Sequence, residues 1–116
     1  MSLFETGNFR LHSGQFSKWK INCETLYEED LRTLALIANE RINRFGVVIG
    51  IPRGGLAFAE HMSKYASTGP ALIVDDVLTT GASMEKMKKA IPDAQGLVIF
   101  ARGPVPDWIT PIFRMS

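Results

Sequence analysis

One stretch of this chain constrains its fold more than any other, from Ala71 to Ser83. Four apolar residues run directly into two adjacent carboxylates, Asp75 and Asp76, and a turn rich in Thr, Gly and Ser follows. A helical pattern begins at Met84. A short apolar run bounded by turn residues is typical of a buried strand in a parallel sheet. The stretch therefore predicts a strand, a turn and a helix joined in one α/β unit.

The residues after this predicted strand suit a ribose that carries a phosphate. Ligands of open α/β sheets lie outside the carboxyl ends of the strands, so Asp75 and Asp76 are expected at the mouth of a site. Paired carboxylates can accept hydrogen bonds from neighbouring ribose hydroxyls, and free N–H groups at a helix N-terminus can bind the phosphate. The predicted phosphate-binding residues are Thr79, Thr80, Gly81, Ala82 and Ser83. The alternative is a solvated turn with an ordinary helix cap.

A second loop of the same kind lies further towards the N-terminus. The apolar run from Gly46 to Ile51 predicts a buried strand, and Pro52-Arg53-Gly54-Gly55 follows it at the start of another helix. Adjacent glycines allow a close approach of the backbone, and Arg53 offers a fork of donors to phosphate oxygens. A plain connection between strand and helix is the alternative here.

The remaining chain alternates between strand and helix patterns. We expect two short strands or a loose hairpin between residues 4 and 21, and a helix that Thr25 and Glu28 cap and Gly46 ends. Further elements are expected over residues 56–65 and 84–90 (helices) and over 96–101 and 109–115 (strands). This order predicts a doubly wound, mostly parallel α/β sheet. The length of 116 residues predicts a single domain, with residues 1–24 as a small N-terminal segment and 25–116 as the core.

Composition and charge exclude several classes of function. A formal net charge of +1 gives no broad field that would favour nucleic acid or a membrane surface as a partner. Cys23 is the only cysteine, which excludes an intrachain disulfide and fits a reducing cytoplasm, the expected location. His12 and His61 lie far apart with no Cys/His cluster, so a structural zinc site is not expected.

The order of residues in Ala71–Ser83 resembles the signature of the phosphoribosyltransferases, which bind 5-phosphoribosyl pyrophosphate (PRPP). The segment from Phe9 to Asn22 resembles the start of the orotate phosphoribosyltransferases, where Phe-x-Leu-Lys-Ser-Gly precedes Ser, an aromatic residue and Asn. His12 departs from that phrase, since the family often has a base-contacting Lys there. The resemblance implies the type I phosphoribosyltransferase fold, with residues 1–24 as a hood over the base.

The same resemblance implies transfer of a phosphoribosyl group from PRPP to a nitrogen base, a pyrimidine such as orotate, with release of pyrophosphate. Mg²⁺ would arrive on PRPP, near Asp75, rather than be held directly by the protein, and the chain would form a homodimer. The implied roles are catalysis for Asp75 and Asp76, pyrophosphate binding for Arg53, Gly54 and Gly55, and base binding for His12, Lys20 and Arg102. A hairpin packed on the core, and an exposed charge at Arg102, are the alternatives for the last group.

One feature of the orotate enzymes is missing from this sequence. They place a long basic loop ahead of the strand that carries the PRPP signature, and it closes over the substrate with Lys and Arg. Here only residues 66–70 lie between the predicted helix and that strand, and none is Lys or Arg. Cations and Mg²⁺ on the leaving pyrophosphate are the main means of lowering the barrier to this reaction. Two functions follow as alternatives, an active transferase and a weakly active or inactive module that binds PRPP or a nucleotide.

Overall fold

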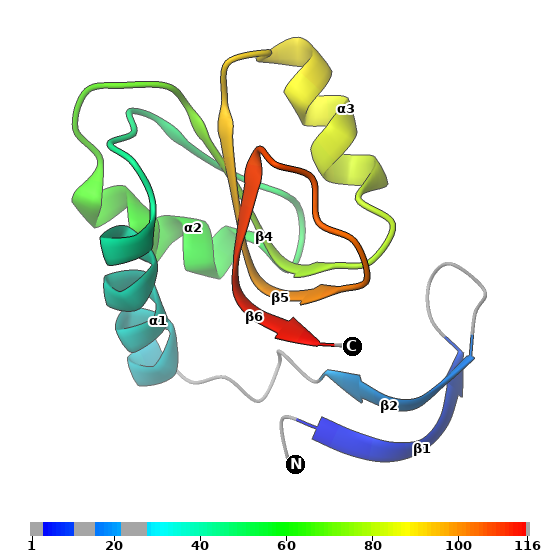
Figure 1. Ribbon diagram of the computed structural model, residues 1–116. Helices are drawn as coiled ribbons and strands as arrows, with labels where there is room; N and C mark the ends of the chain where they lie inside the picture. Colours follow the sequence, from blue (N-terminus) through cyan, green and yellow to red (C-terminus); the bar gives the residue numbers. More distant parts are fainter. Residues whose placement is uncertain (1–3, 11–15, 22–27, 116) are drawn as a thin grey trace.

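The computed structural model describes residues 4–10, 16–21 and 28–115 (Figure 1). The main sheet has four parallel strands in the order β3-β4-β5-β6. Their bounds are Val48–Gly50 for β3, Leu72–Leu78 for β4, Gln95–Arg102 for β5 and Ile109–Met115 for β6. The helices are α1 (Glu28–Arg41), α2 (Leu56–Met62), which runs into the 3₁₀ turn η2 (Ser63–Tyr65), and α3 (Ala82–Ala90).

Helices cover both faces of the sheet, as a doubly wound architecture requires (Figure 1). α1 and α2 pack on one face, where Ala38, Phe58 and Met62 are almost fully buried against strand residues such as Val74. α3 packs on the other face, where Met84 is buried in a second cluster with Ile73. The predicted parallel α/β sheet is confirmed. No helix in the described part of the chain has the length and apolar character needed to cross a membrane.

β4 extends beyond its neighbour β3, and this difference in length positions the acidic pair. β3 ends opposite Val74, where Gly50 is its last paired residue, whereas β4 stays paired with β5 up to Leu78. Asp75 and Asp76 therefore lie within β4, and the prediction that the strand ends at Val74 is wrong. The strand continues because the apolar run of β5 supplies a hydrogen-bonding partner along the whole of this segment.

The N-terminal segment forms a hairpin, as its turn signals and alternating residues predict. β1 (Phe4–Arg10) and β2 (Phe16–Ile21) pair in antiparallel fashion as a separate two-stranded sheet. The predicted cap at Thr25 lies outside the described residues. α1 ends at Arg41, earlier than the predicted stop at Gly46, and the guanidinium of Arg41 donates a hydrogen bond to the carbonyl of Ile112 in β6 (2.7 Å).

Side chains of α3 contact the segments before β5 and β6. The indole N–H of Trp108 donates to Glu85 Oε1 at 3.1 Å, and Lys88 Nζ donates to the carbonyl of Ala94 at 2.8 Å. Lys88 Nζ also lies 5.2 Å from the centre of the Trp108 ring, within the range of a cation–π interaction. The position of α3 is therefore tied to the segment that leads into β6.

Truncation of Phe58 tests the packing of α2 on the sheet. Phe58 is 1% exposed, so Phe58→Ala should lower the free energy of unfolding by about 3–5 kcal/mol through lost burial and a cavity. Leu36→Ala on α1 is the control, because Leu36 is 51% exposed and its loss should change stability by less than about 0.5 kcal/mol. Urea denaturation followed by circular dichroism measures both. Equal effects would contradict the packing described here.

Candidate active site

β3 is shorter than β4, and the loop after β3 lies beside the part of β4 that extends past the end of β3. The N–H of Ile51 donates to the carbonyl of Val74 at 2.8 Å, which is the last bond between this part of the chain and β4. The N–H of Gly55 then returns to the carbonyl of Ile51 at 2.9 Å and closes the loop. The peptide bond between Pro52 and Arg53 is cis. Residues 51–55 are thereby held against the part of β4 that carries the two carboxylates.

Gly54 lies directly against the side chain of Asp76. A Cβ atom built on Gly54 would overlap the carboxylate of Asp76 and approach its Oδ1 to 2.8 Å. Only a residue without a side chain allows the loop this close to the acid. The structure thus brings together two of the motifs predicted from the sequence, the glycine loop and the acidic pair.

Local hydrogen bonds orient both carboxylates. The N–H of Asp76 donates to Asp75 Oδ1 at 2.8 Å, and the N–H of Val77 donates to Asp76 Oδ1 at 2.7 Å. Both acidic side chains are half-buried. Each carboxyl group therefore has one oxygen engaged by a backbone N–H, and the two side chains also share a hydrogen bond.

Asp75 has an unusually high pKa for a carboxyl group. The pKa of Asp75 is raised from 3.8 to about 7, mainly by burial and in addition by a hydrogen bond shared with the Asp76 carboxyl group and by repulsion between the two like charges. The backbone N–H of Asp76 acts in the opposite direction. A buried carboxyl group of this kind favours a ligand that brings positive charge to it.

The turn between β4 and α3 has the geometry of an anion site. Gly81 is the N-cap of α3 with φ 79° and ψ 5°, a left-handed conformation that side chains disfavour. No side chain forms a capping hydrogen bond, and the closest polar contact is a long one of 3.4 Å from the N–H of Ala82 to Thr80 Oγ1. The first N–H groups of α3 therefore point out of the helix without an intrahelical acceptor. Thr79, Thr80 and Ser83 are exposed around them.

The other predicted site residues are less fully placed. Arg53 is exposed on the loop, and Arg102 is the half-buried last residue of β5. Lys20 lies in β2, and its side chain is not among those that the structure describes. His12 lies outside the described residues. The base-binding role of these last three residues stays a prediction.

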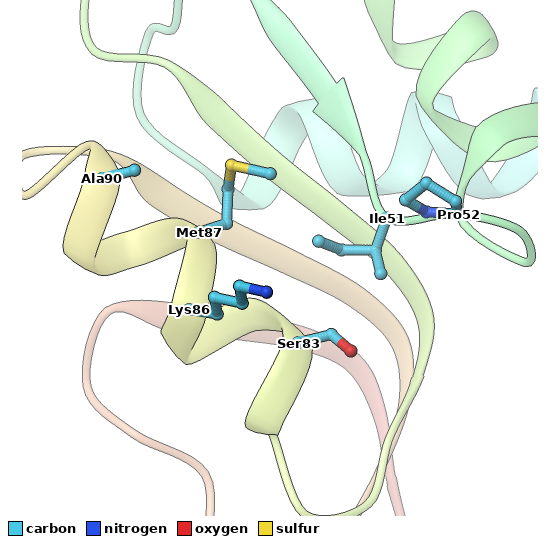
Figure 2. A pocket seen from close by; sticks show the side chains of 6 residues that line it. All are labelled: Ile51, Pro52, Ser83, Lys86, Met87 and Ala90. Atoms are coloured by element: carbon cyan, nitrogen blue, oxygen red, sulfur yellow. The ribbon is translucent and has the colours of Figure 1, made fainter.

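Sequence reasoning missed a pocket of about 450 Å³ between this loop and α3 (Figure 2). Its lining is mostly apolar with one hydroxyl and one ammonium group, from Ile51, Pro52, Ser83, Lys86, Met87 and Ala90. The four residues from α3 recur at helical spacing on one face, which is a signal that the sequence contains. That spacing alone does not tell which surface the face meets.

No protein-family model and no curated protein sequence matches this chain. Solved structures do. The orotate phosphoribosyltransferase from Aeropyrum pernix is 20% identical with a TM-score of 0.81, over 97% of this chain and 88% of that one. The enzyme from Francisella tularensis is 17% identical with a TM-score of 0.65, over 97% and 80% of the two chains. The enzyme of Mycobacterium tuberculosis H37Rv, solved with inorganic phosphate, is 16% identical with a TM-score of 0.67, over 94% and 86%.

These similarities agree with the fold that the sequence resemblance implies. The chain has the fold of the type I phosphoribosyltransferases. The two predicted units of strand, loop and helix are formed by β3 with α2 and by β4 with α3.

Two neighbouring glycines should respond differently to the same substitution. In Gly54→Ala the new methyl group meets the end of the Asp76 side chain, which can rotate away, so ligand binding should suffer more than stability. In Gly55→Ala it would lie 2.5 Å from the carbonyl oxygen of Val74, a backbone atom, so stability should fall by about 1–3 kcal/mol. Thermal unfolding and PRPP calorimetry on both variants separate the two effects. A larger loss of stability in Gly54→Ala would contradict this geometry.

The raised pKa of Asp75 predicts how stability changes with pH. Between these two pKa values the folded protein keeps a proton on Asp75 that the unfolded chain releases. The contribution of Asp75 to the free energy of unfolding is therefore complete below pH 3.8 and is lost as pH rises through about 7. Asp75→Asn cannot lose a proton, so its unfolding temperature relative to the wild type should increase between about pH 5 and about pH 8. Its amide oxygen still accepts the N–H of Asp76. A difference that does not vary with pH would exclude the raised pKa.

Proposed function

We propose that this chain transfers the phosphoribosyl group of PRPP to a nitrogen base, with a pyrimidine such as orotate as the acceptor. The observation that carries the proposal is the meeting of Gly54 with Asp76 on β4, the same strand that leads into the uncapped N-terminus of α3. A pyrophosphate group, a ribose and a 5′-phosphate joined in one molecule match these three neighbouring features in turn. The orotate enzymes among the solved structures of the same fold support this acceptor.

Each part of the site has a role in the proposed reaction. Asp75 and Asp76 accept the ribose hydroxyls and stabilise the positive charge that develops on the ring. Thr79 to Ser83 hold the 5′-phosphate, and residues 53–55 hold the pyrophosphate. The bond from C1 to the pyrophosphate oxygen breaks, and its electron pair leaves with pyrophosphate. The lone pair of the base nitrogen forms the new bond to C1, and the proton of that nitrogen passes to water.

The acidic pair also fits magnesium that arrives with the substrate. Mg²⁺ keeps several waters and is usually bound by one or two carboxylates together with substrate phosphates. Asp75 and Asp76 supply such a pair of carboxylates, each with one oxygen already oriented by a backbone N–H. When bound, Mg²⁺ neutralises negative charge on the leaving pyrophosphate. The half-buried carboxyl of Asp75 would then be ionised.

A second function is favoured by a specific observation. The connection from η2 to β4, residues 66–71, is short and contains no Lys or Arg. A site without a basic cover exposes PRPP to water and leaves charge on pyrophosphate less well compensated. The alternative is therefore a module that binds PRPP or a nucleotide with little turnover. A homodimer in which a second copy covers the site is part of the first proposal.

Release of pyrophosphate distinguishes the two functions. The purified protein is incubated with PRPP, Mg²⁺ and a panel of pyrimidine and purine bases, and orotate should give the largest rate. Asp76→Asn should reduce this rate by about a hundredfold or more, since it removes a charge that faces the reacting sugar. Tight binding of PRPP by calorimetry with no pyrophosphate from any base would support the binding module instead. No binding at all would sink both.

A further inference from the structure

The pocket between the loop after β3 and α3 adjoins the candidate site at one end. Pro52 and Ser83, which line that end, belong to the glycine loop and to the first turn of α3 (Figure 2). Ala90 marks the other end of the pocket, two helical turns along α3. The pocket is therefore bounded by the same two segments that the proposed function assigns to pyrophosphate and phosphate.

Lys86 directs its side chain from α3 into this pocket, towards Ile51 and Pro52 (Figure 2). Within the described residues, no hydrogen bond or ion pair holds its ammonium group. Lys88 differs, because its ammonium is engaged by the carbonyl of Ala94 and the ring of Trp108. The aliphatic stem of Lys86 lies on an apolar lining, while its charged end remains available to an anion.

The acidic residues at the candidate site disfavour binding of an anion unless a nearby cation compensates their charge. Asp75 and Asp76 place two acidic groups where a multiply charged anion would have to bind, and the glycine loop offers one cation, Arg53. Attraction between opposite charges is stronger beside apolar walls than in open water. An ammonium group that reaches the space beside Pro52 from α3 can oppose the charge of a pyrophosphate held by the loop.

We propose that Lys86 binds the pyrophosphate group of the substrate from the side of α3. The identity of this ligand rests on the proposed function, and the site itself rests on the pocket. Lys86 would supply positive charge that residues 66–71 do not contain. It would hold pyrophosphate in the bound substrate and stabilise the charge that grows on it as the bond to C1 breaks.

Calorimetry with inorganic pyrophosphate and Mg²⁺ tests the proposal on the whole chain. Lys86→Met should weaken pyrophosphate binding by about tenfold or more, because it removes a charge-assisted contact and keeps the stem. Lys89→Met is the matched control, since Lys89 lies on the same helix and is exposed like Lys86 but does not line the pocket. It should change the affinity by less than about twofold, because its charge lies outside the pocket and is screened by solvent. Lys86→Arg should restore most of the binding.

Several outcomes would overturn the assignment of Lys86. These are equal effects of Lys86→Met and Lys89→Met, unchanged affinity in Lys86→Met, or no binding of pyrophosphate by the wild type. The unfolding temperature of each variant shows that the fold is retained. A wild type that binds pyrophosphate through Lys86 but transfers no phosphoribosyl group would refute the proposed function and leave this assignment in place. Pyrophosphate release that is the same in Lys86→Met would refute the assignment alone.

Discussion

The hydrogen bond from the N–H of Ile51 to the carbonyl of Val74 determines how the rest of the site is arranged. Among the described residues it is the last backbone hydrogen bond between β4 and the chain that leaves β3, and beyond it β4 is paired on one side only. The open side is where residues 51–55 turn back. Without the difference in strand length, a neighbouring strand would occupy this edge, and the loop could not reach Asp76. The site thus depends on a three-residue strand that stops early.

In the protein without ligand, the half-buried position of the acidic pair is energetically unfavourable. Burial of the Asp75 carboxyl group, with a second carboxyl group beside it, disfavours its ionisation and raises its pKa to about 7. The backbone N–H groups of Asp76 and Val77 offset part of this cost by donating to the two side chains. A ligand that brings a cation and hydroxyl donors would relieve the rest. Groups that are unfavourable in the empty state and favourable in the loaded state are typical of binding sites.

Much of the fold follows from local patterns in the sequence, but the exact end of β4 does not. Apolar runs identified β4, β5 and β6, and the Asp-Asp pair marked the edge of the sheet. The end of β4 was misplaced because Asp is disfavoured in strands, and that local preference is overridden by pairing with β5 through Ala101. The sequence does not predict the close approach of Gly54 to Asp76, because a loop after β3 meets a residue of the neighbouring strand β4 there. Distances between such segments are set by strand register, which a sequence pattern does not reveal.

The pocket beside α3 is a second feature that the sequence pattern does not predict. The helical spacing of Ser83, Lys86 and Ala90 defines a face of α3, yet only the packing of Met84 on Ile73 turns that face towards Ile51 and Pro52. The direct connection from η2 to β4 leaves no room for an inserted basic segment, so positive charge near the glycine loop has to come from elements that also build the fold. Arg53 on the loop and Lys86 on α3 both meet that condition. The helix that supplies the phosphate site therefore also supplies a cation that the connection from η2 to β4 does not contain.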